Sequence, residues 1–176
     1  MARLPEFTLQ FPLEQVPAYA ARFPDEGDVE VLEIGRAARD RGCYTRDEFV
    51  RVCRWKTPRS GPLVAQNSAE VVEARTGVAL GPTAGERERL DALRSLRGVE
   101  WATASVLLHV AFPERYPILD QRALHALGVA PRASYTFPFW EAYVTACLDL
   151  AGRAGVDGRT LDQALWQWSK EQGIPL

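Results

Sequence analysis

The chain has 176 residues, of which 47% are hydrophobic and 25% charged, and its net charge is −2. These values are typical of a globular protein with a core of its own, so disorder is not expected. No apolar run approaches the ~20 residues of a membrane-spanning helix, and the N-terminus lacks a long apolar signal-peptide core, so we expect a cytoplasmic protein with no membrane partner.

Nearly every periodic segment in the first part of the chain has the helical repeat. Two helices are predicted over about 14–22 and 29–41. Thr45 and Glu48 have the spacing of a capping box, which predicts a third helix through about Lys56. The prolines and the glycine of TPRSGP then break the chain.

Positive charge is concentrated in this region. Residues 1–35 hold two arginines and seven acidic residues, whereas residues 36–59 hold eight basic and three acidic residues. The basic helical segment 36–59 has two interpretations, a solvated face or a surface that follows phosphates. The candidate nucleic-acid contacts within it are Arg51, Arg54, Lys56 and Arg59.

The rest of the chain also has the helical repeat. Two helices are predicted from cap pairs: Asn67 with Glu70, toward Ala79, and Thr83 with Glu86, through Leu96. Beyond Gly128, helices are predicted over about 139–154 and 161–172, and the last is expected to close the core. The sum is an all-α fold of eight or nine helices in a single compact domain, 1–176. Its parts are the basic segment 36–59, a helix–turn–helix over 86–112, and an aspartate loop with C-terminal helices over 113–176.

The stretch LRGVEWATASVLLHVAFPERYPILDQRAL, residues 96–124, combines a Gly-centred turn, an almost wholly apolar helix and an aspartate. A helix–Gly turn–helix either offers backbone N–H groups to one phosphate or serves only to pack two helices. His109, inside the apolar helix, is expected to be buried and hydrogen-bonded. Asp120 is expected to be the N-cap of the next helix. The prolines and the buried helix before it also predict a rigidly placed carboxylate.

This stretch resembles the signature of the helix-hairpin-helix (HhH-GPD) DNA glycosylases, the superfamily of endonuclease III and the adenine-mismatch glycosylases. The family motif runs Leu-Pro-Gly-Val-Gly, two residues, Thr-Ala, then an apolar helix and a strip that ends in Asp. The spacing from Gly98 to Asp120 agrees with the adenine-mismatch branch without a gap, and YPILD matches it closely. ALWQWSKEQ and WKTPR are similar to segments of small bacterial relatives.

The resemblance implies two helical lobes with a cleft between them, and hydrolysis of the N-glycosidic bond of a damaged or mispaired base in base-excision repair. Asp120 falls on the essential aspartate, which stabilises the positive charge that develops on the sugar and helps to orient the attacking water. The target base is flipped out of the stack. The residues implied to contact double-stranded DNA are Arg97, Gly98, Val99, Glu100, Trp101 and Arg122, together with the four basic residues named above.

The chain departs from the family pattern at several positions. The second hairpin glycine is Glu100, and a carboxylate there repels a phosphate. The hairpin proline is Arg97, which either compensates for that charge or pairs with Glu100. Ala102 stands where the lyase-competent branch has its Schiff-base lysine, so the resemblance implies a monofunctional enzyme.

The sequence gives few indications of cofactor sites or of further acid–base residues. Three dispersed cysteines exclude the four-cysteine iron–sulfur loop, and no metal site is expected beyond a monovalent cation at the hairpin. Because 32 residues separate Gln66 from Gly98, we interpret the likeness of VAQN to a glutamine wedge of the family as coincidence. The candidates for a second catalytic carboxylate are Glu70, Glu73 and Glu141.

Three functions stay open at this point. The first is a DNA glycosylase. The second is an inactive module of the same fold that binds DNA or another ligand, which Glu100 and the sequence pI of about 5.8 favour. The third is a structural helical domain. A monomer is the default expectation.

Overall fold

The computed structural model describes residues 4–24, 27–130 and 132–173. This part of the chain is all-helical, with ten α-helices, two 3-10 helices and no strand, which confirms the predicted all-α class. None of its helices is both long and apolar enough to cross a membrane. The chain divides into two compact units: unit 1 is Met1–Pro24 with Glu114–Leu176, and unit 2 is Asp25–Pro113.

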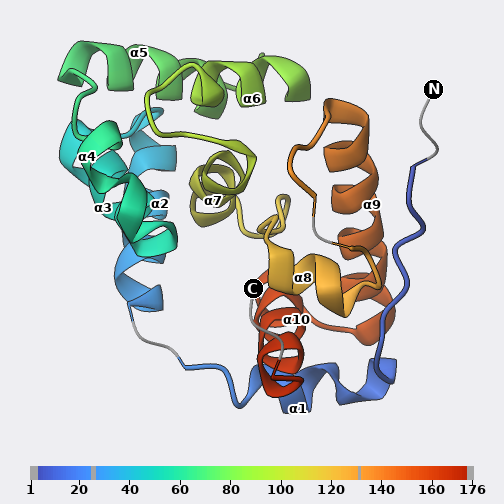
Figure 1. Ribbon diagram of the computed structural model, residues 1–176. Coiled ribbons are helices and arrows are strands. Elements are labelled where there is room, and N and C mark those ends of the chain that lie inside the picture. The colour runs from blue at the N-terminus through green and yellow to red at the C-terminus, as the bar shows by residue number, and fades with distance from the viewer. Residues whose placement is uncertain (1–3, 25–26, 131, 174–176) are drawn as a thin grey trace. The chain divides into compact units, whose positions relative to one another are not determined.

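Unit 2 is built around one central helix, α7. Its elements are α2 (Asp28–Arg41), α3 (Arg46–Lys56), η2 (Pro58–Ser60), α4 (Gly61–Val64), α5 (Ala69–Leu80), α6 (Glu86–Arg94) and α7 (Trp101–Ala111). Helix α7 contacts α2, α3, α5 and α6 (Figure 1). Every residue of α7 except Ala102 is buried, as its apolar sequence predicts, and this includes His109.

Helix α2 approaches α7 very closely at Gly35. A β-carbon at this position would lie 1.9 Å from the carbonyl oxygen of Val110. No side chain fits in that distance, so glycine permits the two backbones to pack against each other.

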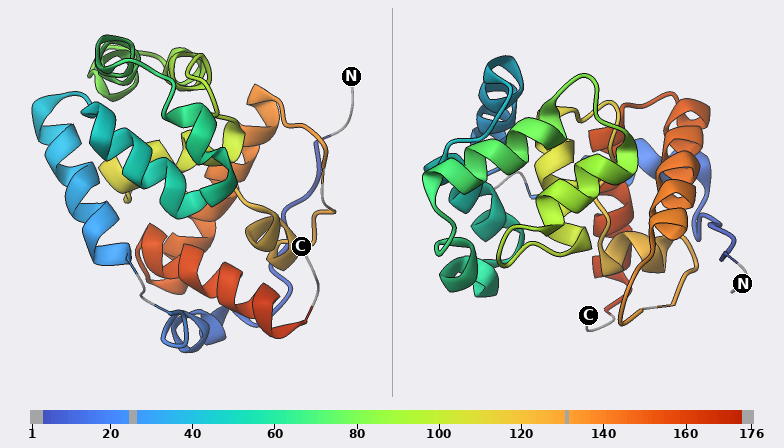
Figure 2. Two further views of the ribbon diagram at one scale, coloured as in Figure 1. Left: turned by 60° about the vertical axis from the view of Figure 1, so that its left-hand side comes forward. Right: turned by 90° about the horizontal axis from the view of Figure 1, so that it is seen from above.

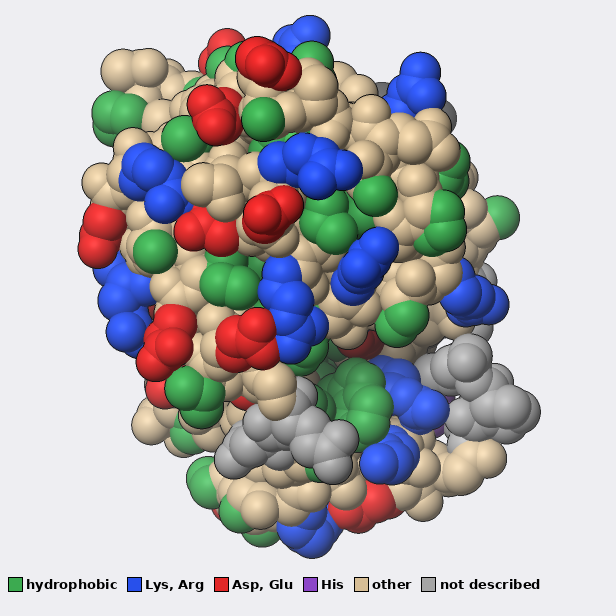
Figure 3. Space-filling view, turned by 90° about the vertical axis from the view of Figure 1, so that its left-hand side faces the viewer, with side chains coloured by type: hydrophobic (Ala, Val, Ile, Leu, Met, Phe, Trp, Pro, Cys, Tyr) green, Lys and Arg blue, Asp and Glu red, His purple; other side chains and the backbone are tan. Residues whose placement is uncertain are grey.

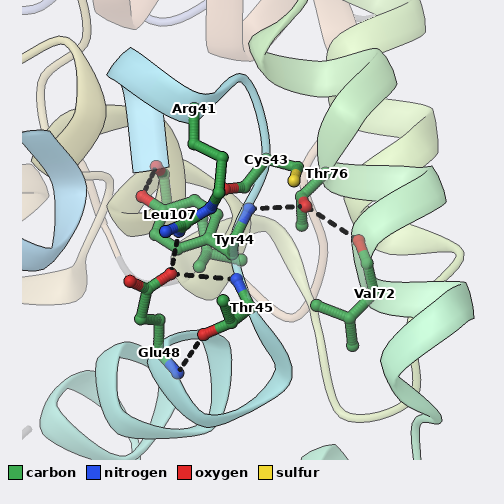
Figure 4. A network of polar contacts seen from close by, with 8 residues as sticks. All are labelled: Arg41, Cys43, Tyr44, Thr45, Glu48, Val72, Thr76 and Leu107. Atoms are coloured by element: carbon green, nitrogen blue, oxygen red, sulfur yellow. Dashed lines mark hydrogen bonds and ion pairs between the residues drawn. The ribbon is translucent and has the colours of Figure 1, made fainter. Parts of the chain in front are cut away.

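Tyr44, which lies between α2 and α3, bonds to two further helices of unit 2 (Figure 4). Its buried hydroxyl donates to the carbonyl oxygen of Leu107 in α7 at 2.6 Å, and its backbone N–H donates to Thr76 Oγ1 in α5 at 2.9 Å. Burial raises the pKa of Tyr44 well above its usual value, so the phenol stays a neutral donor. Beside it, Thr45 and Glu48 form both hydrogen bonds of the predicted capping box.

Unit 1 is organised around α10. Its elements are η1 (Leu13–Gln15), α1 (Val16–Ala20), α8 (Gln121–Ala126), α9 (Phe137–Ala154) and α10 (Gly158–Glu171). Helix α10 contacts α8, α9 and α1, and it lies side by side with α1 (Figure 2). Leu161 and Leu165 are buried, and the Trp168 ring stacks on Phe11 at 5.6 Å between centroids. The last helix therefore closes the core of unit 1, as predicted.

Several predicted helix boundaries were wrong, and the following lie in unit 2. Helix α5 is capped by Ser68, which accepts from the backbone N–H of Val71, because the Asn67 amide is engaged elsewhere. Helix α6 begins after Gly85, whose extended backbone leaves Thr83 in the preceding turn, and it ends at Arg94. The segment TPRSGP, which is predicted to break the chain, contains η2 and the start of α4, since a proline in the first turn favours a helix start.

Candidate functional site

Asp120 begins the short helix α8. Its backbone is extended, with φ −144° and ψ 169°, and its Oδ1 accepts a hydrogen bond from the backbone N–H of Ala123 at 2.7 Å. The predicted N-cap is therefore confirmed. The side chain is half-buried, so the carboxylate has a fixed direction in a partly desolvated position.

The Asp120 strip, residues 114–120, is held by burial of its central residues and by a hydrogen bond from α9. Tyr116, Ile118 and Leu119 are buried. Tyr143, which is fully buried in α9, donates its hydroxyl to the carbonyl oxygen of Ile118 at 2.6 Å. The backbone is thus fixed two residues before Asp120.

Helix α8 is also anchored at its C-terminal end. The extended N-terminal segment donates from the backbone N–H of Thr8 to the carbonyl oxygen of Leu127, and from that of Gln10 to Ala126, both at 2.9 Å. A helix of six residues is not stable alone, so these contacts contribute to holding it in place.

Two phenols lie within electrostatic range of the Asp120 carboxylate. The pKa of Tyr135 is raised, first by burial and then by the charge of Asp120. The pKa of Tyr143 is raised well above its usual value, again mainly by burial, and Asp120 adds to the effect. Both phenols stay protonated near neutral pH. Tyr135 is a neighbour of Asp120 that the sequence did not single out.

A second carboxylate, Asp162 in α10, also lies within electrostatic range of the Tyr143 phenol. It is 7% exposed, pairs with Arg159, and its charge also raises the pKa of Tyr143. The carboxylates considered from sequence differ from it, because Glu70, Glu73 and Glu141 are exposed and the first two belong to unit 2. Asp162 was missed because nothing in its local sequence marks burial of an acid.

The hairpin turn, residues 95–100, connects α6 to α7 in unit 2, so the helices predicted on its two sides are confirmed. Gly98 has φ +78°, and a β-carbon there would lie 2.8 Å from Val64 Cγ1. Both observations require glycine. Glu100 is the N-cap of α7, but its side chain accepts no hydrogen bond from the first-turn N–H groups of that helix.

Of the two alternatives for Arg97, the structure does not show the ion pair with Glu100. The Glu100 carboxylate, 83% exposed, lies 3.7 Å from Arg94 Nη2. Arg97 donates from Nη1 to Gln66 Oε1 at 2.8 Å, so a pair between Arg97 and Glu100 is not formed. The guanidinium carbon of Arg94 also lies 4.3 Å from the centroid of the Trp101 ring. Gln66 therefore lies beside the turn, although α5 and α6 separate the two in the chain.

The predicted basic surface is partly neutralised. Arg51 donates from Nε to Oε1 and from Nη2 to Oε2 of Glu30, at 2.7 and 2.5 Å. Arg54 lies against Gly61, and Arg59 is exposed, whereas Lys56 is half-buried. Figure 3 shows the side on which α3 and α4 lie, and Asp and Glu side chains are interspersed there with Lys and Arg.

The sequence-predicted site residues thus form two groups. Val99, which is buried, and the other turn residues belong to unit 2 with Arg51, Arg54, Lys56 and Arg59. Asp120 and Arg122 belong to unit 1, where the guanidinium carbon of Arg122 lies 5.3 Å from the centroid of the Trp166 ring.

Metal ligands and relatives give no further indication of function. The three cysteines are free thiols, and the described residues contain no cluster of three or more side chains that could hold a metal ion. No family model matches the chain, and comparisons with curated proteins and with solved structures give no match. A functional assignment therefore depends on the residues themselves.

Proposed function

We propose that the chain is a monofunctional DNA glycosylase-like enzyme that hydrolyses the N-glycosidic bond of a damaged or mispaired base. The observation that carries the proposal is the placement of Asp120. Its carboxylate is half-buried, is directed by a cap bond to Ala123, and follows a strip fixed by Tyr143. The motif resemblance of residues 96–124 supports the same role.

The chemistry needs a fixed negative charge. As the bond between the sugar C1′ and the base nitrogen breaks, its electron pair leaves with the base and positive charge develops on the sugar. A preorganised carboxylate stabilises that charge without reorganising. Water then bonds to C1′ and gives up a proton, for which Asp120 is the proposed acceptor. The departing base takes up a proton from solvent, and Asp120 later releases its proton to solvent, so that one water is divided between the sugar and the base.

The hairpin turn is proposed to hold the DNA backbone. Gly98 allows a close approach, and the first-turn N–H groups of α7 are suited to a phosphate. Glu100 opposes this role, because its exposed carboxylate lies at the start of the same helix. The same observation favours a second candidate, a module that keeps the scaffold and binds without chemistry.

The test is a screen of purified protein against duplexes that carry different lesions, with Asp120→Asn and Asp157→Asn as a matched pair. Asp157 caps α10 as Asp120 caps α8, since its Oδ1 accepts from the N–H of Thr160 at 2.7 Å. Asparagine caps helices as well as aspartate does, so each variant loses the charge and keeps a cap.

Asp120→Asn is expected to lower base release by at least about 100-fold and to leave duplex affinity intact or improved. Asp157→Asn should match the wild type in both. Full activity of Asp120→Asn would refute the catalytic assignment. Salt-sensitive duplex binding without release from any lesion would favour the binding module, and no binding at low salt would leave a structural domain.

A further inference from the structure

Asn67 makes an unusual set of contacts with the hairpin turn. The residue is buried, with 6% of its surface exposed. Its Oδ1 accepts from the backbone N–H of Arg97 at 2.9 Å, and its Nδ2 donates to the carbonyl oxygens of Arg97 and Val64, at 3.0 and 2.9 Å. One amide thus pairs with both backbone groups of a single residue of the turn, and both of its N–H donors are used.

These bonds fix the turn together with a steric contact one residue further on. At Gly98, a β-carbon would lie 2.8 Å from Val64 Cγ1 and 3.0 Å from Leu63 Cβ. Glycine by itself has wide conformational freedom. The polar contact at Arg97 and the packing at Gly98 together remove that freedom.

The loop that carries Asn67 is itself anchored. Arg46, at the start of α3, donates to the carbonyl oxygens of Ala65 and Asn67 at 2.6 and 3.1 Å. A continuous set of hydrogen bonds therefore runs from α3 through this loop to the turn.

Helix capping does not account for Asn67. The adjacent Ser68 caps α5, so the amide of Asn67 is not needed for that helix and is directed at residue 97 instead. Since it is buried, Asn67 acts on a ligand only through the turn.

We infer that Asn67 is the positioning residue that orients the hairpin turn toward a phosphodiester backbone, an inference that rests on the proposed DNA-binding role of that turn. The amide holds the peptide groups on both sides of Arg97 and so sets the direction in which the chain enters α7. The groups that would meet the phosphate follow within four residues, at Gly98 to Trp101.

The test compares Asn67→Ala with Ser68→Ala, a neighbour whose loss removes the α5 cap and leaves the turn bonds in place. Binding to an undamaged duplex is measured at about 50 mM salt, below the melting temperature of both variants. Asn67→Ala is expected to weaken binding about tenfold, and Ser68→Ala by less than about twofold. Should Asn67→Ala fail to fold, Asn67→Asp, which keeps the acceptor and loses both donors, takes its place.

Amide hydrogen exchange without DNA separates this inference from the proposed function. Asn67→Ala should accelerate exchange at Arg97 and through the turn, and Ser68→Ala should not. Accelerated exchange in a protein whose wild type binds no duplex would overturn the proposed function and leave Asn67 as the residue that orders the turn. Unchanged exchange and unchanged binding would overturn the inference.

Discussion

The Asp120 strip and the hairpin turn are held in place in different ways. The strip lies in unit 1, where Tyr116, Ile118 and Leu119 are buried and the Tyr143 phenol bonds to the backbone at Ile118. The turn in unit 2 is held by an amide that lies 30 residues away in the chain and by contact of Gly98 with Val64. The direction of the Asp120 carboxylate depends on a local bond, from the N–H of Ala123 three residues on, whereas the turn depends on contacts that local sequence does not reveal.

The largest effect is expected at the turn. Gly98→Ala should lower the free energy of unfolding by about 2–4 kcal/mol, because an alanine at φ +78° is strained and its β-carbon meets Val64 at 2.8 Å. Denaturant unfolding measures this. Gly77→Ala is the control. Gly77 is helical, and a β-carbon there would lie 4.0 Å from its nearest neighbour, the carbonyl oxygen of Gly42, so this substitution should be neutral or stabilising. Equal stability of Gly98→Ala and wild type would mean that the turn is not constrained.

The strip should respond to loss of its phenol bond. Tyr143→Phe leaves the carbonyl oxygen of Ile118 without that donor in a buried position, which should cost about 1–2 kcal/mol. Tyr44→Phe is the matched variant. It should cost about 0.5–1 kcal/mol, because Leu107 lies within α7, where helical hydrogen bonding still satisfies its carbonyl oxygen. If Tyr44→Phe lowers the free energy of unfolding more than Tyr143→Phe does, the phenol bond contributes little to the strip. Burial of the strip would then be what holds Asp120.

Sequence reasoning succeeded where a residue and its partner are close in the chain. The caps at Thr45 and Asp120 were found because each bonds to a backbone N–H three residues on. The apolar run of α7 correctly predicted burial. The all-α class follows from such local patterns.

The residues that were missed have partners far away in the chain. The spacing of Asn67 and Glu70 predicts that Asn67 caps a helix, whereas in the structure its amide bonds to Arg97. Asp162 and Tyr135 gain their surroundings from packing, since burial is the largest cause of the raised pKa of Tyr135. No spacing rule reports which acid or phenol becomes buried.

Removing the charge that opposes the turn should sharpen its role. Glu100→Gln is expected to strengthen duplex binding about fivefold at low salt, because about 1 kcal/mol of repulsion is lost for a charge near 4 Å from a phosphate. The gain should vanish near 1 M salt. Glu73→Gln, an exposed charge in α5, serves as the control and should have little effect. An equal gain from both variants would show that net charge, not the turn, controls binding.

The smallest effect is expected at Arg51. Its guanidinium is held by both oxygens of Glu30, so the pair presents little net charge to a phosphate. Arg51→Gln should leave the slope of log K against log salt unchanged, whereas Arg54→Gln should reduce it by about 1 if Arg54 contacts one phosphate. A reduced slope for Arg51→Gln would mean that DNA displaces Glu30 and that the basic segment, rather than the turn, provides the main contact in unit 2.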